Sequence, residues 1–303
     1  MDFEPFLTHW RVKKSCSEQT IRSYRNDLKL FQEFLHGRSI SRLTQVNYAV
    51  IDQYIDHMKQ KANPRFGRTG LSDSSIARRL ATLSSFFEYV RATTNPKMRN
   101  PLSDLTRKWK KNDEPKPVEG VVLDQLLDGI SNLRDRVLIS LFLATGLRVS
   151  EMCSLNRDTI HIGAEEDGNG QEQIGGEGEV VGKGNKRRTF FVDETTLQLF
   201  AEYLVTRTDD HPALFLSERK QRISVRAVQY TLATWCRRLG LPHLNIHRLR
   251  HSFASQLANA NIASMVLMKL MGHNSFTTTQ RYFKLHDTTL ARGYFAAAEY
   301  LRK

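Results

Sequence analysis

The sequence has few cysteines and no long apolar segment. Its three cysteines, Cys16, Cys153 and Cys236, lie far apart along 303 residues. They form neither a disulfide framework nor a pair of zinc ligands, so we expect a reducing compartment, the cytoplasm. No run approaches eighteen apolar residues, which argues against a transmembrane helix. The N-terminus lacks a basic start followed by an apolar run, and no secretory signal is therefore expected.

Acidic residues are also under-represented. The chain has 32 Asp and Glu against 45 Lys and Arg, a formal net charge of +13. The net charge is +9 over residues 1–119 and +4 over residues 120–303. A basic balance in both halves favours a polyanion partner, although a basic surface without a partner is the alternative. One segment is an exception, because residues 165–179 hold six acids and no base.

The length and apolar content predict two domains with separate cores. Residues 1–108 are expected to form an all-α bundle, because three segments show helical periodicity: 17–36, 46–59 and 74–91. Residues 109–119 are charged, contain two prolines and have no apolar period, so they predict an extended linker. The second domain then spans residues 120–303.

The second domain is predicted to be mainly helical with one small sheet. Helical patterns occur in the segments 134–145, 195–206, 224–239, 247–260, 262–271 and 288–301. Strand-like alternation occurs in three segments: 159–162, 179–182 and 188–192. Three short strands joined by turns imply a small three-stranded antiparallel sheet. The predicted fold class is therefore mainly α, with a helical N-terminal domain and a mixed second domain.

An ordered set of six polar residues in the second domain indicates one reaction. The set is Arg148, Lys183, His247, Arg250, His273 and Tyr282. Cleavage of a phosphodiester by a side chain needs an attacking oxygen, donors for the non-bridging oxygens and a proton for the leaving alkoxide. A phenol, two arginines, a lysine and two histidines supply these functions. Each residue type is common alone, and only the ordered set points to this chemistry.

Two other kinds of site are less consistent with these residues. The turn at Lys183 lacks the Gly-x-x-x-x-Gly-Lys-[Ser/Thr] form of a nucleotide-binding loop and read alone is a plain hairpin turn. His247 and His251 have the spacing of a zinc pair, but Arg248 replaces the glutamate of His-Glu-x-x-His. We expect no metal and no cofactor, and we expect His251 to be a packed histidine.

The motifs around the six residues resemble those of tyrosine recombinases, the phage-type integrases, and are most similar to the Xer type. They are ATGLRVSE at 144–151, GKGNKRR at 182–188, HRLRH at 247–251, MGHNS at 271–275 and TTQRY at 278–282. The resemblance implies a SAM-like core-binding domain followed by a catalytic domain. It also implies site-specific DNA recombination through a Holliday junction.

The resemblance assigns the central roles to Tyr282 and the two arginines. Tyr282 would attack phosphorus and hold a 3′-phosphotyrosyl link, while Arg148 and Arg250 clamp the scissile phosphate. Lys183 would protonate the 5′-hydroxyl leaving group. No metal or nucleotide would be needed, because the tyrosyl ester conserves the bond energy.

The two histidines and a glutamate complete the implied site. His247 would be the acid/base partner of the tyrosine, and His273 would donate a hydrogen bond to the phosphate. Glu151 lies three residues after Arg148 on a short predicted helix, faces the same way and could orient a catalytic side chain.

The resemblance also implies a DNA partner and an assembly. The candidate DNA contacts are Arg65, Arg68, Arg78, Arg79, Lys186 and Arg187. Arg65 and Arg68 lie in a basic loop, and Arg78 and Arg79 are expected on the exposed face of the helix at 74–91. The partner would be a double-stranded recombination site, bound by a tetramer of this chain or of this chain and a paralogue. The terminal helix, within 284–303, is expected to dock on a neighbouring protomer rather than in cis.

Several alternatives stay open at this level. The chain could serve chromosome dimer resolution and segregation, or act as a phage, transposon or integron integrase of the same family. A type IB topoisomerase and an inactive DNA-binding relative are less favoured. Residues 165–178, rich in glycine and acid, are expected to form a flexible loop that lengthens the first hairpin. Such a loop would point away from DNA or contact a basic partner, unless it is only a tolerated insertion.

Overall fold

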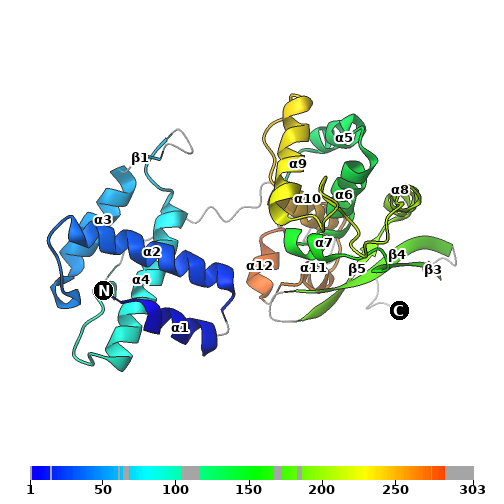
Figure 1. The fold of residues 1–303 in the computed structure, drawn as a ribbon. Helices are drawn as coiled ribbons and strands as arrows, with labels where there is room; N and C mark the ends of the chain where they lie inside the picture. The colour runs from blue at the N-terminus through cyan, green and yellow to red at the C-terminus, as the bar shows by residue number, and fades with distance from the viewer. Residues whose placement is uncertain are drawn as a thin grey trace, which may run out of the picture. The chain divides into compact units, whose positions relative to one another are not determined.

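The computed structural model divides the chain into two compact units, Met1–Asn112 and Asp113–Lys303 (Figure 1). The described residues are 2–13, 16–60, 62–63, 68–103, 105, 117–166, 172–182, 186–273 and 275–283. The backbone alone is described for residues 62–63, 68, 164–166 and 172–173. The division falls inside the segment predicted as a linker, 109–119. Within the described part of the chain, no helix is long and apolar enough to cross a membrane.

Unit 1 is a helical bundle, as its apolar periodicity predicts. Its helices are α1 (Glu4–Val12), α2 (Glu18–His36), the 3-10 turn η1 (Leu43–Gln45), α3 (Tyr48–Gln60) and α4 (Asp73–Thr93). A two-stranded hairpin, β1 (Ala62–Asn63) with β2 (Arg68–Thr69), lies between α3 and α4. Ser17 and Ser72 cap α2 and α4, each accepting a backbone N–H three residues on. Aromatic side chains from four helices fill the core: Phe6, Phe31, Tyr54 and Phe87.

A buried carboxylate joins α2 to α4. Asp27 is 1% exposed and accepts two hydrogen bonds from the Arg78 guanidinium, at 2.5 and 2.9 Å, and a third from Thr82 Oγ1 at 3.2 Å. Arg79 Nε lies 3.6 Å from the same carboxylate, and only 19% of that side chain is exposed. The prediction that Arg79 lies on the outer face of α4 is therefore wrong, because the buried Asp27 draws its guanidinium inward. Arg78 keeps 51% of its side chain exposed.

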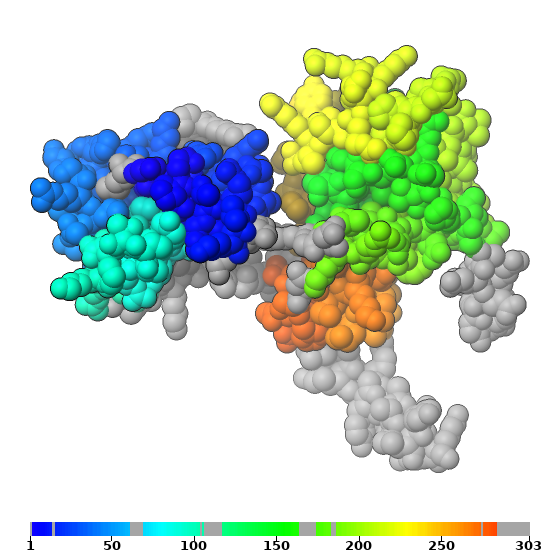
Figure 2. Space-filling model, turned by 60° about the horizontal axis from the view of Figure 1, so that its bottom comes forward, coloured from blue at the N-terminus to red at the C-terminus, as the bar shows by residue number. Residues whose placement is uncertain are grey.

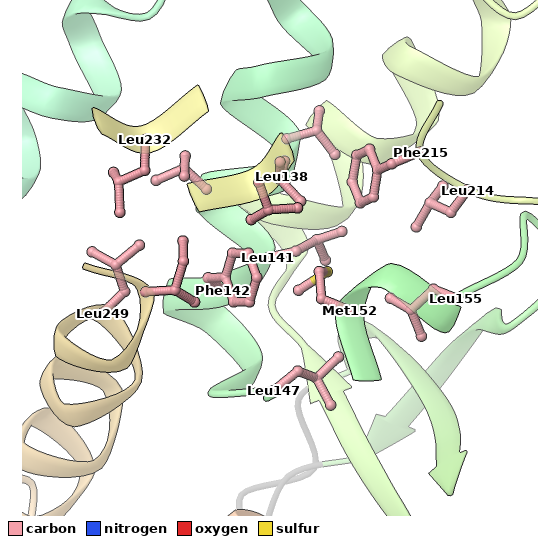
Figure 3. Close-up of a cluster of buried hydrophobic side chains, with 14 of the residues drawn as sticks. Leu138, Leu141, Phe142, Leu147, Met152, Leu155, Leu214, Phe215, Leu232 and Leu249 are labelled. Carbon is pink, nitrogen blue, oxygen red and sulfur yellow. The ribbon is translucent and has the colours of Figure 1, made fainter. Parts of the chain in front are cut away.

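Unit 2 is built around one buried helix. Its helices are α5 (Gly120–Gly129), α6 (Leu133–Thr145), α7 (Val149–Ser154), α8 (Glu194–Val205), α9 (Val225–Arg238), α10 (Ile246–Asn259), α11 (Ser264–Met271) and α12 (Phe276–Gln280). Helix α6 packs against both α8 and α10, which explains its dense apolar run. Figure 3 shows Leu138, Leu141 and Phe142 of α6 surrounded by Leu232, Leu249, Met152 and Phe215.

The sheet of unit 2 is antiparallel in the order β3–β4–β5. Its strands are β3 (Ile160–Glu166), β4 (Glu172–Val181) and β5 (Arg187–Val192). The fold class predicted from the sequence, mainly α with one three-stranded antiparallel sheet in the second domain, is confirmed.

The prediction of a long flexible loop over 165–178 is wrong for residues 165–166 and 172–178, which lie in strands, while residues 167–171 lie outside the described part of the chain. Residues 172–178 belong to the central strand β4, and the register pairs Ile160 with Gly178 and Gly176 with Val192. Strand pairing uses backbone groups, so a segment poor in strand-forming side chains can still pair between two neighbours. Its glycines meet a packing need, because a Cβ on Gly178 would lie 2.6 Å from the Phe190 ring. The glycine-rich composition therefore reflects close packing at this strand.

The Asp27 network should dominate the stability of unit 1. We expect Asp27→Ala to lower the free energy of unfolding by about 3 kcal/mol, because it leaves the cations of α4 without their buried partner. The matched control is Glu4→Ala, which removes an exposed bidentate pair with Arg25 and should cost less than about 1 kcal/mol. Urea unfolding of both variants measures the difference. Equal losses of unfolding free energy in the two variants would show that burial does not make the Asp27 network more stabilising than an exposed ion pair.

Candidate active site

A left-handed glycine at the end of α6 sets the position of Arg148. Gly146 has a φ of 57°, and a Cβ there would lie 2.2 Å from the Phe253 ring. Both facts favour glycine, which ends the helix and turns the chain sharply. Leu147 and Met152 are fully buried on either side of Arg148, and both point into the core of unit 2 (Figure 3). The Arg148 side chain therefore projects from a rigid backbone at the start of α7.

Glu151 links two arginines from different elements. Its Oε2 accepts hydrogen bonds from Arg148 N at 2.8 Å and Arg188 Nη2 at 2.7 Å, and its Oε1 accepts from Arg148 Nη1 at 2.7 Å. The residue is 3% exposed. Burial by itself would raise the pKa of Glu151, but the hydrogen bonds from Arg148 and Arg188 outweigh it and the pKa is lowered. Glu151 is therefore an ionised, shared counter-charge at neutral pH.

Arg188 is a site residue that the sequence reasoning missed. Its side chain is 8% exposed and donates to Glu151 and to the Leu270 carbonyl. A Cβ on Gly272 would lie 2.7 Å from Arg188 Cδ, so the two residues pack tightly. The signal was available in β5, where Arg188 shares the inward alternation of the buried Phe190 and Val192.

Arg250 is a buried cation that joins the ends of two helices. It is 7% exposed on α10 and donates to the carbonyls of Gly146 and Met271, at the ends of α6 and α11. Burial lowers the pKa of Arg250 to about 10, with the positive charges of Arg148 and Arg188 acting in the same direction. The guanidinium still carries its charge at neutral pH, and its two anchors fix the plane it presents.

The end of α11 repeats the geometry found at the end of α6. Gly272 has a φ of 58° and accepts a 2.7 Å hydrogen bond from Arg148 Nη2. His273 follows, and its Nδ1 lies 2.8 Å from Thr279 Oγ1. Burial lowers the pKa of His273 to about 4, and the nearby Arg250 and Arg148 add to the effect. His273 is therefore neutral near pH 7.

The phenol of Tyr282 lies beside His251. Tyr282 is 8% exposed after α12, and its oxygen is 2.6 Å from His251 Nδ1. The His273 ring stacks on Tyr282 with 6.4 Å between centroids and 11° between planes. Burial raises the pKa of Tyr282, while Arg250 and Arg281 oppose that rise. Among the described residues, the structure thus brings three arginines, two histidines and the phenol into one cluster.

His251 was predicted to be a packed histidine, and the structure gives it a polar contact as well. His251 is half-buried, but its imidazole has a polar partner in the Tyr282 hydroxyl. His247, which the family resemblance pairs with the tyrosine, is exposed in the first turn of α10. His251 lies one turn after His247 and directly after Arg250, so the helical spacing alone could have drawn attention to it.

Some predicted site residues lie outside the described part of the chain. They are Lys183, Arg65 and the terminal segment 284–303, and only the backbone of Arg68 is described. The neighbouring Gly182 donates its N–H to the Lys186 carbonyl at 2.8 Å, and a Cβ on it would lie 3.3 Å from Glu151 Oε1. Lys186 is exposed, and Arg187 is 77% exposed beside Glu179. The catalytic and DNA-binding assignments of these residues stay predictions.

In the space-filling view, α11 and α12 (orange) form one surface of unit 2 beside the elements of its first half (green) (Figure 2).

A family model described as the phage integrase family matches residues 118–289, and one for the phage integrase N-terminal SAM-like domain matches residues 3–93. The chain belongs to the phage integrase family. Both units are covered by these matches, so the family assignment extends over the helical bundle as well as the site.

Relatives of known name agree with this assignment. Tyrosine recombinase XerC of Haemophilus influenzae (strain PittEE) is 32% identical over 297 residues, covering 95% of this chain and 94% of that protein. Tyrosine recombinase XerC of Caldanaerobacter subterraneus subsp. tengcongensis is also 32% identical and covers 95% of this chain and 84% of that protein. The predicted resemblance to tyrosine recombinases is confirmed, and with it the class of enzyme that breaks and rejoins DNA.

Solved structures share the fold. XerH site-specific recombinase bound to its difH substrate matches with a TM-score of 0.67 at 19% identity, covering 90% of this chain and 78% of that chain. The Tn1549 transposon integrase in complex with circular intermediate DNA matches with a TM-score of 0.70 at 19% identity, covering 95% and 96%. At this identity the two likenesses support the fold alone.

Glu151 should stabilise unit 2 only while it is ionised. We expect Glu151→Gln to lower the free energy of unfolding by about 3 kcal/mol at pH 7, because two arginines lose their buried counter-charge. The pKa of Glu151 is lowered on folding, so its contribution is present above its ordinary value of 4.5 and is lost as the pH falls through the lowered pKa. The gap between wild type and variant in urea unfolding should therefore narrow below about pH 4.5.

The exposed Glu202→Gln on α8 is the matched control and should show little change at any pH. A gap for Glu151→Gln that stays constant down to pH 3 would contradict an electrostatic role for this carboxylate.

Proposed function

We propose that this chain is a site-specific DNA recombinase in which Tyr282 attacks a DNA phosphodiester. The attack gives a 3′-phosphotyrosyl link and a free 5′-hydroxyl, and strands are exchanged through a Holliday junction. One observation carries the proposal: Tyr282 and the anchored Arg250 are both buried, at 8% and 7% exposed, and the Arg250 charge acts to lower the pKa of the phenol. The family membership and the XerC relatives favour recombination over the other reactions considered for this chain.

The charge balance of the cluster suits a phosphate diester. Three guanidinium groups, of Arg148, Arg188 and Arg250, act on one another electrostatically, and the carboxylate of Glu151 is their counter-charge among the described residues. An anion that enters this cluster relieves repulsion among the cations, and a planar guanidinium can bind two phosphate oxygens. Bonds to described residues use two of the five N–H donors of the Arg250 guanidinium, so others are available for substrate.

The reaction then divides among named side chains. Tyr282 supplies the attacking oxygen, and Arg148 and Arg250 neutralise the charge that develops on the non-bridging oxygens. Lys183 is proposed as the acid for the 5′-oxygen, on the basis of its motif, and His273 as a hydrogen-bond donor to the phosphate through the ring nitrogen that does not face Thr279. His247 is proposed as a further acid/base group. The expectation that no metal or other cofactor takes part stays a prediction.

The proposed partner is a double-stranded recombination site. Solved relatives include XerH bound to difH substrate and a lambda integrase dimer bound to a COC′ core site. The excess of basic residues in both halves of the sequence supports the same partner. Arg65, Arg68, Arg78, Lys186 and Arg187 are proposed DNA contacts, and Arg79 is a weaker candidate because of its burial. We further propose a tetramer on two sites, homomeric or with a paralogue, in which segment 284–303 docks on a neighbour.

The nucleophile is tested with DNA selected by the protein itself. Wild type selects duplexes from a pool with a randomised centre, and nicked suicide versions of the selected duplex then trap covalent products. We expect Tyr282→Phe to bind the duplex normally and to give no covalent adduct, because the phenol is the attacking group. Wild type should give protein on a 3′ end and a free 5′-hydroxyl. The exposed Tyr230→Phe is the matched control; an adduct formed by Tyr282→Phe would disprove the assignment of the nucleophile.

The arginines should act in cleavage more than in binding. We expect Arg148→Ala and Arg250→Ala to slow single-turnover cleavage by at least about 10²-fold, because each removes donors from the transition-state charge. Affinity in a gel-shift titration should change by less than about tenfold, since many other phosphates are contacted. The exposed Arg237→Ala on α9 serves as control. Variants that lose binding and cleavage in equal proportion would argue for a purely DNA-anchoring role.

A further inference from the structure

The hydroxyl of Tyr282 has a nitrogen partner that the family-based assignment does not give it. His251 Nδ1 lies 2.6 Å from the phenolic oxygen, a short distance for an O–H···N contact. The rings are 5.8 Å apart between centroids and tilted by 43°, so they are not stacked face to face. Among the described residues, this is the hydrogen-bond partner of the phenol.

The contact is held from both sides by rigid elements. His251 follows Arg250 on α10, and Arg250 is fixed by the carbonyls of Gly146 and Met271. Tyr282 donates its backbone N–H to the Thr279 carbonyl at 3.0 Å, and Thr279 is fully buried. The side chain of Tyr282 also packs with Phe253, Ala254 and Met271 in one apolar cluster. The short contact is thus imposed by packing on two separate segments of chain.

The electrostatic surroundings keep the imidazole able to accept a proton. Burial lowers the pKa of His251 first, and His247 and Arg250 of α10 and Arg281 beside α12 lower it further. A neutral imidazole donates from one ring nitrogen and accepts at the other, so Nδ1 accepts from the phenol when the proton is on Nε2. The negative phosphate of a substrate would then stabilise the imidazolium that forms, because it offsets the nearby guanidinium charges.

Building on the proposed function, we propose that His251 is a catalytic residue, the base that takes the proton of Tyr282 as the phenol attacks phosphorus. The phenolic O–H bond breaks and the new P–O bond to Tyr282 forms, while the P–O bond to the 5′-oxygen breaks. The phenolic proton moves to Nδ1 of His251, and the 5′-oxygen receives a different proton from a separate acid. In the reverse step, the 5′-hydroxyl gives its proton back to the separate acid as its oxygen attacks phosphorus, the P–O bond to Tyr282 breaks, and His251 returns its proton to the departing phenolate.

The assignment separates the duties of two histidines one turn apart. His251 reaches the phenol, whereas His247 is exposed at the start of α10 and is left for the phosphate or the leaving group. His251 is also distinct from the acid that serves the 5′-oxygen. A substrate whose 5′-bridging oxygen is replaced by sulfur tests this division, because a thiolate leaves without a proton.

The central test compares His251→Asn with wild type on the selected nicked duplex. The Asn amide oxygen lies near the place of Nδ1, so it can accept the phenolic hydrogen bond but cannot take the proton. We expect single-turnover cleavage to fall by about 10²-fold or more with DNA binding unchanged. The loss should persist on the 5′-thio substrate, where a Lys183→Ala loss should be relieved. The wild-type rate should decline at acid pH as His251 becomes protonated, and the variant should lack that decline.

Three results would overturn the proposal. The first is a cleavage rate of His251→Asn equal to that of wild type. The second is full relief of the His251→Asn defect by the 5′-thio substrate. The third is a His247→Asn single variant in which attack by the phenol is slowed as much as in His251→Asn. The exposed His243→Asn, in the loop before α10, controls for loss of an imidazole in this region. Covalent adducts formed by Tyr282→Phe would instead contradict the proposed function. Failure of the His251 proposal and failure of the proposed function are therefore distinguishable.

A measurement on the unsubstituted protein covers the case in which the variants fold poorly. Wild type labelled with ¹⁵N-histidine reports the protonation state of each ring nitrogen by NMR. We expect the His251 signal to show an unprotonated, hydrogen-bonded Nδ1 at pH 7 that is perturbed in Tyr282→Phe. A protonated Nδ1 at neutral pH would exclude His251 as the base.

Discussion

The site depends on one buried cation, Arg250. Its guanidinium donates hydrogen bonds to two backbone carbonyls, one at the end of α6 and one at the end of α11, in place of bulk water. A charge that is 7% exposed is costly unless its donors are satisfied, so the two helix ends are held where those carbonyls can reach it. Arg148 and His273 follow these same helix ends. The position of Arg250 therefore sets the spacing of the residues on both sides of the proposed phosphate.

The two glycines at those helix ends have a matching role. Gly146 and Gly272 both adopt left-handed backbone, and both expose a carbonyl that accepts from a site arginine. A side chain at either position would meet Phe253 or Arg188 at less than contact distance. Each helix thus ends in a turn that supplies both a tight packing surface and an anchor for a guanidinium. The catalytic geometry is built from backbone caps as much as from side chains.

Much of the fold was predictable from the sequence because apolar periodicity is local. The pattern at 17–36 predicted α2, and the dense run at 134–145 predicted the buried α6. The site was predictable in its membership, through an ordered set of motifs, but not in its contacts. That His251 faces the phenol depends on how α10 packs against the segment after α12, which no local pattern encodes. Arg79 failed for the same reason, because a buried carboxylate on another helix determines which way it turns.

The strand β4 has a consequence for how unit 2 would approach a charged polymer. Gly182, directly after β4, lies beside Glu151 and Arg148. The exposed Glu177 lies five residues earlier on the strand, roughly 17 Å away at the usual rise per residue. The basic cluster and the carboxylate of Glu177 therefore form the two poles of an electric dipole along the sheet. In the field of a nucleic acid, such a dipole exerts a torque before any contact is made. The hairpin would then orient the unit so that its basic pole arrives first.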